Sequence, residues 1–328
     1  MVNQLPHVGP ASVLKRAGWQ DTEELRVNNW LTAWDGQEAL DAGFLGAPYS
    51  GASISSSGAS GGPEGIRLAF RYNTTYSADF ETDIRDLRVR DLGDIAGHIT
   101  DVAVAHDQIE AAVAAATKIE PRFVPLIIGG DHSITAPAVR GFCAAHPGKR
   151  VGLINFDAHF DVRNFAYGRH NGTPFRAILE SGRVAGQNLV EIGIHGFNGS
   201  ASYHAWARER GMTIFTGRQV QGRGMEDCVA EALARAGDGT DVIYVSVDID
   251  CLAYPWAIGT SATTAEGLSA WQLLEGVYAC GLDPKVAALD LVEIDPSRDV
   301  KDLTCRTGCS VLLTFLAGLH RRPHSVAH

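Results

Sequence analysis

Acidic and imidazole side chains alternate in the segment Asn155–Arg163, which follows an apolar run at 151–154. Asp157, His159 and Asp161 are two residues apart, and in an extended segment every second side chain points to the same side. The spacing therefore aims two carboxylates and an imidazole at one point. These ligands suit Mn²⁺, with Ni²⁺ the alternative and Co²⁺ or Zn²⁺ also compatible. A polar loop after a strand is the competing interpretation, because short motifs also occur by chance.

Three further apolar runs, which we predict to be strands, end in residues of the same kind. They are His132 after the run at 124–128, Asp248 and Asp250 after the run at 242–247, and Glu293 after the run at 286–292. In parallel sheets, ligands bind beyond the carboxyl ends of the strands. Acidic groups gathered there would repel one another without a cation. The sequence therefore predicts two divalent ions that neutralise the carboxylates and activate water for hydrolysis.

Apolar runs alternate with helical patterns along most of the chain, which predicts an α/β fold with a mostly parallel sheet covered on both faces. The predicted strands are 43–48, 124–128, 151–156, 189–194, 213–215, 242–247 and 286–292. The predicted helices are 63–70, 101–119, one ending near 145, 175–180, 201–210, 225–236, 269–280 and 302–318. The Gly/Ser-rich stretch at 49–62 is predicted to be a functional loop, since such loops inside domains often are.

We expect residues 41–328 to form one domain, preceded by an N-terminal extension at 1–40. The extension contains Trp19, Trp30 and Trp34. We expect it to pack on the domain or on a neighbouring subunit, and an alternative is that these aromatic side chains line a substrate entrance. The chain has six cysteines without a C-x-x-C pair, so we expect most of them to be small buried apolar residues rather than zinc ligands.

The net charge of −10 disfavours a nucleic-acid-binding protein, which would be basic. The N-terminus has no basic-then-apolar targeting pattern, and no apolar run reaches the length of a membrane span. We therefore expect a cytoplasmic protein that acts on a small molecule and associates with neither nucleic acid nor membranes.

The motifs together resemble the ureohydrolase superfamily, which contains the arginases, agmatinases, guanidinobutyrases and formimidoylglutamases. The matching segments are G-G-D-H-S at 129–133, D-A-H-F-D at 157–161, S-V-D-I-D at 246–250 and V-E-I-D-P at 292–296. The resemblance covers about residues 43–318 and implies a three-layer α/β/α sandwich. It also implies a homo-oligomer, a trimer or hexamer, with a hetero-oligomer as the alternative.

The resemblance implies a ligand set for each of two metal ions. One ion would be held by His132, Asp157, Asp161 and Asp248, and the other by Asp157, His159, Asp248 and Asp250. Asp157 and Asp248 would bridge the two ions. Glu293 matches the carboxylate that binds the amidinium group of the substrate, a bidentate and charge-assisted contact.

The sequence departs from the family pattern at the residue that arginases and agmatinases use to carry a proton. That histidine immediately precedes the glycine of a G-T-P-F-like segment, and here the position is Asn171, with His170 one residue earlier. We expect His170 to be either the catalytic replacement or a solvated loop residue. His195, His204 and His146 are expected to be structural or surface residues.

The substrate class rests on Arg163, which begins on the same side of the extended segment as the ligands. Its planar guanidinium suits a carboxylate and stays charged at working pH values. Ion pairing with Asp161 or with an N-terminal residue is the alternative role. D-A-H-F-D-V-R, N-G-T-P-F and 194–200 look most like formimidoylglutamases, whereas Asp131 and Ser133 look like agmatinases and guanidinobutyrases.

We therefore expect a hydrolase that cleaves the C–N bond of N-formimidoyl-L-glutamate. The alternatives are a guanidinobutyrase or agmatinase, or a guanidine or biguanide hydrolase, the last suggested by the unusual segments Ala253-Tyr254 and 258–263. A non-catalytic partner subunit of a ureohydrolase complex is the alternative of another class.

Overall fold

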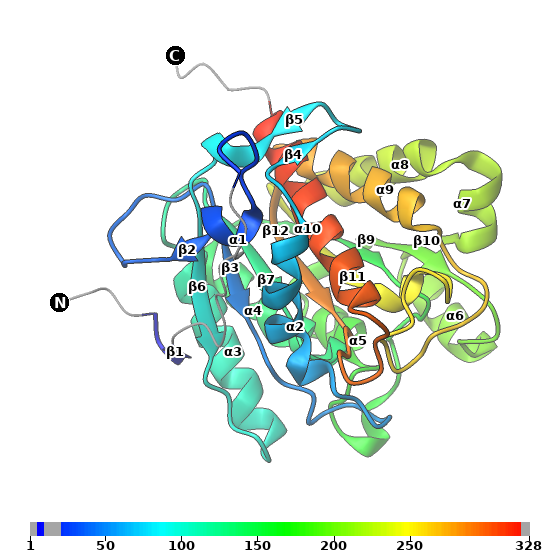
Figure 1. Ribbon diagram of the computed structural model, residues 1–328. Coiled ribbons are helices and arrows are strands. Elements are labelled where there is room, and N and C mark those ends of the chain that lie inside the picture. Colours follow the sequence, from blue (N-terminus) through cyan, green and yellow to red (C-terminus); the bar gives the residue numbers. More distant parts are fainter. Residues whose placement is uncertain (1–4, 10–20, 323–328) are drawn as a thin grey trace.

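The computed structural model describes residues 5–9 and 21–322 around a ten-stranded sheet (Figure 1). The strand order is β1-β6-β3-β7-β12-β11-β8-β9-β10, and β2 also pairs with β6. Every pairing in this sheet is parallel except that of β1 with β6. The strands are β1 (Val8–Gly9), β2 (Thr32–Ala33), β3 (Ala42–Gly46), β6 (Val89–Ile95), β7 (Val124–Ile128), β8 (Val151–Phe156), β9 (Val184–Ile194), β10 (Thr213–Thr216), β11 (Val242–Asp248) and β12 (Val286–Val292). A separate hairpin pairs β4 (Tyr76–Ser77) with β5 (Thr82–Asp83).

Helices cover both faces of the sheet, and a hydrophobic core lies under each layer. One core includes buried side chains of α2 (Gly62–Ala69), α7 (Gly217–Arg223), α8 (Met225–Gly237), α9 (Ala270–Leu282) and α10 (Leu303–His320). The other includes side chains of α3 (Val102–Ala116), α4 (Thr135–Ala145), α5 (Pro174–Glu180) and α6 (Ala201–Glu209). Figure 1 shows α10 and α2 lying in front of the central strands. The predicted three-layer α/β/α sandwich is confirmed.

The predicted elements form where local chemistry favours them. The apolar strands β7, β8 and β11 are buried along their whole length, as expected for parallel strands with both faces covered. Asp101 caps the start of α3 with its side chain, and Ser269 forms a capping box at the start of α9. Pro63 lies in the first turn of α2, where its missing N–H costs nothing.

Strand β6 was not predicted, because its sequence contains Arg90, Asp91 and Asp94. It is nevertheless mostly buried and pairs with β3. The fully buried Arg67 of α2 explains this: its Nε lies 2.7 Å from Asp91 Oδ2, and its Nη1 lies 2.5 Å from Asp94 Oδ1. A buried charge is tolerated only when it is paired and hydrogen-bonded, and Arg67 meets that condition for both acids.

The N-terminal segment adds short elements along one edge of the sheet. The strands β1 and β2 both pair with β6, and α1 (Val27–Trp30) precedes β2. Trp30 donates from Nε1 to the Arg85 carbonyl, and Trp34 donates to the Glu38 carbonyl. Trp19 lies outside the described residues. All six cysteines are free and five are buried, with Cys143 partly exposed, which confirms their predicted role. None of the helices in the described ranges has both the length and the apolar character of a membrane span.

Candidate metal centre

Four neighbouring strands deliver the predicted ligands to one edge of the sheet. The order β7-β12-β11-β8 is continuous, and each of these strands carries its acidic or histidine residues at the carboxyl end. The alternation of side chains along a strand then directs the residues to a common point. The structure thus brings together the residues that the sequence motifs had separated by up to 161 positions, His132 and Glu293 being the most distant pair.

His132 is the centre of the first ligand group. Its Nδ1 lies 3.3 Å from Asp157 Oδ2, 3.0 Å from Asp161 Oδ2 and 3.1 Å from Asp248 Oδ2. The same Nδ1 is buried and has no hydrogen bond of suitable direction to any described residue. An imidazole nitrogen surrounded by carboxylate oxygens in this way is a suitable set of ligands for a divalent cation.

His159 forms a second group with Asp157 and Asp250. Its Nδ1 lies 3.4 Å from Asp157 Oδ1 and 3.2 Å from Asp250 Oδ2. Asp157 therefore turns one oxygen toward each histidine, which is the arrangement of a bridging ligand. Asp248 Oδ2 faces His132, and its Oδ1 accepts the backbone N–H of Asp250, just as Asp157 Oδ1 accepts that of His159. The ligand atoms of His132, Asp157 and Asp248 all lie within 4.8 Å of one another, and so do those of Asp157, His159 and Asp250.

The orientation of the His132 ring is fixed by its neighbours. Ser246 Oγ donates its only proton to Asp290 Oδ1 at 2.6 Å, so the His132 Nε2–H must donate to Ser246 Oγ at 3.1 Å. Asp290 also accepts from Thr135 and Tyr244. This tautomer leaves the lone pair on Nδ1, the nitrogen that faces the carboxylates. A metal-binding histidine needs such support at its other nitrogen.

The electrostatics of the cluster call for positive charge. Burial and the neighbouring carboxylates of Asp250 and Asp157 raise the pKa of Asp248 well above its usual value. Burial disfavours the charged form of His132, yet the carboxylates of Asp157, Asp161 and Asp248 around its Nδ1 raise its pKa well above the usual value. The buried carboxylates therefore need protons or a cation to neutralise them. A divalent ion supplies more positive charge at this place than a proton does.

Glu293 lies beside the cluster in a backbone conformation that glutamate rarely adopts, with a φ of 63°. Its Oε1 accepts from the backbone N–H of His132 at 2.9 Å, and its backbone N–H donates to the Gly130 carbonyl. Burial, followed by the negative charge of Asp131, raises the pKa of Glu293 to about 8. Strain of this kind is typical of functional sites, and a cationic partner would stabilise the carboxylate form.

Asn171, and not His170, contacts Glu293. Asn171 Nδ2 donates to Glu293 Oε1 at 3.1 Å, and its Oδ1 accepts the backbone N–H of Ile54. His170 Nδ1 instead accepts the backbone N–H of Gly172 at 3.1 Å, and its ring is buried rather than solvated. The contact with Ile54 brings the Gly/Ser loop 49–62 over the centre.

Arg163 is exposed and lines a cavity of about 230 Å³. The same cavity is lined by His159, Asp161 and Asn198. Within the described part of the chain, the guanidinium of Arg163 forms no ion pair, so the alternative pairing with Asp161 is not found. Arg163 is therefore a cation without an ion-pair partner among the described residues, and it lines the same cavity as two of the predicted ligands.

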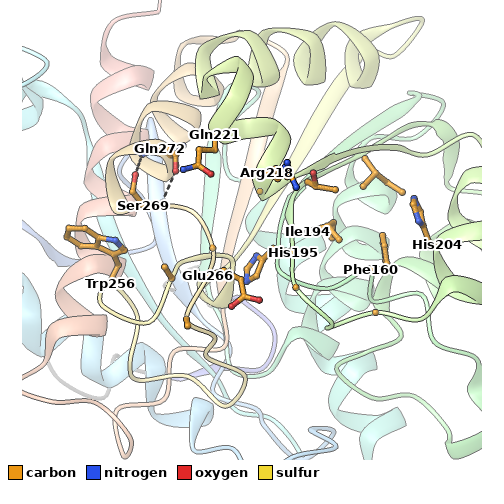
Figure 2. A pocket seen from close by; sticks show the side chains of 18 of the residues that line it. Phe160, Ile194, His195, His204, Arg218, Gln221, Trp256, Glu266, Ser269 and Gln272 are labelled. Carbon is orange, nitrogen blue, oxygen red and sulfur yellow. Dashed lines mark hydrogen bonds between the residues drawn. The ribbon is translucent and has the colours of Figure 1, made fainter.

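A larger cleft of about 1260 Å³ lies beyond the carboxyl ends of β9 and β10, and it does not contain the ligand groups (Figure 2). Phe160 lines both this cleft and the smaller cavity. Its ring stacks on His204 at 5.3 Å between centroids, and Figure 2 shows the two side chains side by side. Of the other histidines, His195 bonds the Gly193 carbonyl and Thr264, and His146 bonds the Phe142 carbonyl.

The sequence patterns did not identify the residues that hydrogen-bond the ligands or their partners from within the sheet, namely Asn155, Glu191, Ser246 and Asp290. Asn155 and Ser246 each stand two positions before a ligand and therefore share its face of the strand. A polar residue at such a position inside an otherwise apolar strand could have indicated these supporting residues.

Comparison with known proteins places the chain among hydrolases of one family. The model of the Arginase family matches residues 40–318. The formimidoylglutamase of Halalkalibacterium halodurans is 40% identical over 303 residues, which are 92% of this chain and 94% of the relative. The crystal structure of formimidoylglutamase from Bacillus subtilis superposes with a TM-score of 0.89 at 36% identity, covering 94% of this chain and 97% of that one. The crystal structure of Trypanosoma cruzi formiminoglutamase with Mn²⁺ has a TM-score of 0.83 at 27% identity and covers 92% of this chain and 100% of that one.

Proposed function

The chain belongs to the arginase family, and from this premise we propose that it hydrolyses N-formimidoyl-L-glutamate to L-glutamate and formamide. Members of this family, including formimidoylglutamases, are metal-dependent hydrolases of amidines, and this chain is a formimidoylglutamase-like hydrolase. The reaction adds water to the formimidoyl carbon, and the bond from that carbon to the glutamate nitrogen breaks.

We propose that the two ligand groups hold two Mn²⁺ ions, with Ni²⁺ the alternative. One ion would be bound by His132, Asp157, Asp161 and Asp248, and the other by Asp157, His159, Asp248 and Asp250. The Trypanosoma cruzi relative with Mn²⁺ supports this choice of ion. The orphaned Nδ1 of His132 and the excess of buried carboxylates support the fit of a cation.

The residues around the ions would orient the substrate and handle protons. The bound ions supply Lewis acidity that activates a water molecule. Glu293 would accept hydrogen bonds from the cationic amidine, and its burial strengthens that pairing by reducing the screening by water. Asn171 contacts the same carboxylate and holds it in place. His170 carries protons between the site and solvent, since burial and the nearby Arg163 lower its pKa below the usual 6.5 and keep the ring neutral.

The guanidinium of Arg163, which has no ion pair with any described residue, is the single observation that carries the substrate assignment. It lines the small cavity together with His159 and Asp161, so a substrate held by its amidine near the ions extends toward it. A carboxylate at the far end of the substrate would pair with it in a bidentate contact. Agmatine, which ends in an ammonium group instead, would be repelled.

A product-resolved assay tests this proposal. The purified protein with Mn²⁺ is supplied with N-formimidoyl-L-glutamate, 4-guanidinobutanoate or agmatine, and formamide, urea and ammonia are measured separately. We expect formamide from the first compound at the highest kcat/KM. If urea from 4-guanidinobutanoate is the main product, the substrate assignment is wrong. If agmatine is preferred, the proposed pairing of Arg163 with a substrate carboxylate is wrong as well.

We further propose that the enzyme is a cytoplasmic homo-oligomer, a trimer or hexamer. The six free cysteines support a reducing compartment. Light scattering on the purified protein measures the number of subunits.

A further inference from the structure

Four polar residues form a row across four neighbouring strands, one level below the ligands. Strand register pairs Asp290 of β12 with Ser246 of β11, Ser246 with Asn155 of β8, and Asn155 with Glu191 of β9. All four side chains are fully buried. We call Asp290, Ser246, Asn155 and Glu191 the buried polar row.

The first half of the row orients His132 through Ser246, as described above. The second half reaches Asp157. Asn155 Nδ2 donates to Asp157 Oδ2 at 3.1 Å and to Glu191 Oε2 at 2.8 Å. One amide group therefore uses both of its N–H bonds on two carboxyl groups, and Glu191 does not itself bond the ligand.

This second half is costly for the fold. Asn155 Oδ1 and Glu191 Oε1 are buried and have no hydrogen-bond partner among the described residues. Each such group loses its hydration without compensation, and an apolar pair of similar shape would avoid that loss. Stability therefore does not explain the presence of the Asn155–Glu191 pair. Buried polar groups without a partner call for a functional reason.

We propose that Glu191 is a positioning residue that holds the amide of Asn155 with its nitrogen toward Asp157. The amide has a donor end and an acceptor end of almost equal size. Without an acceptor at position 191, Asp157 alone would orient the amide, and the second N–H of Asn155 would lose its bond within the row. With Glu191 in place, the donor end faces both carboxyl groups. The two Asp157 oxygens then stay directed toward His132 and His159.

The inference rests on the proposed function, since it assumes that Asp157 binds the ions. Its consequence is specific: because Asp157 has one oxygen in each ligand group, loss of Glu191 weakens the binding of both ions. Support for metal ligands from residues that do not touch the metal typically contributes about 10- to 100-fold in affinity.

Calorimetric titration of the metal-free protein with Mn²⁺ tests the proposal. Glu191→Met removes the acceptor and replaces it with an unbranched, adaptable apolar side chain. We expect this variant to bind Mn²⁺ about 10- to 100-fold more weakly at both sites. Glu191→Gln keeps an acceptor oxygen and should restore affinity to within about threefold. Asn188→Leu, which deletes a buried amide on the same strand that bonds only the Arg235 and Asp238 carbonyls, is the matched control and should leave the affinity near that of the wild type.

A double-mutant cycle separates positioning from general damage. Asn155→Leu should weaken Mn²⁺ binding as Glu191→Met does, and the double variant should be no worse than Asn155→Leu alone, because Glu191 acts only through Asn155. Denaturant unfolding of the metal-free proteins should show Glu191→Met to be as stable as the wild type.

Three results would overturn the inference: wild-type affinity in Glu191→Met, equal losses in Glu191→Gln and Glu191→Met, or additive losses in the cycle. If Glu191→Met does not fold, the Mn²⁺ affinities of Glu191→Gln and Asn155→Leu decide whether the inference holds. Failure of the wild type itself to bind two ions would instead overturn the proposed function.

Discussion

The side-chain amide of Asn171 lies 3.1 Å from Glu293 Oε1, at the position where the resemblance to arginases and agmatinases leads us to expect a histidine. The neighbouring His170 points its Nδ1 at the backbone N–H of Gly172 instead. The proposed proton carrier and the residue that contacts Glu293 are therefore two adjacent residues, and each can be tested separately.

The pH dependence tests the proposed proton carrier. Burial and Arg163 lower the pKa of His170 below 6.5, so the ring is neutral at pH 7 and becomes charged as the pH falls through the lowered value. We expect kcat/KM to fall on this acidic limb. Arg163→Ala removes the neighbouring positive charge, so it should raise this pKa and move the limb to higher pH. Mn²⁺ content is measured at each pH, and an unmoved limb at constant metal content would exclude His170.

The contribution of Arg163 to substrate binding should appear in KM. Arg163→Ala removes the partner of the substrate carboxylate far from the reacting carbon, so KM should rise about 10- to 100-fold, with kcat nearly unchanged at pH 7, the pattern of lost uniform binding. Arg169→Ala is the control, because Arg169 is an exposed arginine on the same loop. Steady-state kinetics measure both, and equal KM values for the two variants would argue against a carboxylate substrate.

Metal binding should contribute strongly to thermal stability. A ligand that binds only the folded state at a concentration of about 1,000 times its Kd stabilises that state by about 4 kcal/mol. We therefore expect a chelator to lower Tm clearly and to abolish activity, and added Mn²⁺ to restore both. Calorimetry and elemental analysis check this prediction. A Tm that is independent of metal, or less than one ion per chain after reconstitution, would contradict the dinuclear centre.

The two aspartates after β11 should differ in importance. Asp248→Ala should lose more metal than Asp250→Ala, because we propose that Asp248 contributes to both ions and Asp250 to one. Elemental analysis after dialysis gives the ratio, with Asp250→Ala expected to keep about one ion per chain. Similar metal contents in the two variants would show that Asp248 does not bridge.

His106 should make the fold less stable at acidic pH. Burial lowers its pKa to about 4, whereas an unfolded chain has a histidine pKa of about 6.5. The unfolded state binds more protons between these values, so the stability is full above pH 6.5 and falls as the pH decreases toward 4. Between pH 7 and pH 5 the loss is up to about 2 kcal/mol. Urea unfolding of the metal-free wild type and of His106→Gln measures it, and equal slopes with pH would refute it.

The sequence by itself determined the strands whose apolar runs are continuous and the residues that follow them. Strands β7 and β12 were predicted at their observed bounds, and so was the convergence of His132 and Glu293 at one sheet edge. The reason is local: burial of both faces of a parallel strand requires an uninterrupted apolar run, and chain direction then fixes which end carries the ligands.

Only the tertiary structure decided features that depend on partners distant in sequence. Strand β6 exists because Arg67 of α2 compensates Asp91 and Asp94, and no pattern within 89–95 contains that information. The pairing of Asn155 with Glu191 likewise follows from the order of β8 and β9 in the sheet. A buried polar group is stable only beside its partner, and the identity of that partner is set by strand order and register, which a single sequence does not specify.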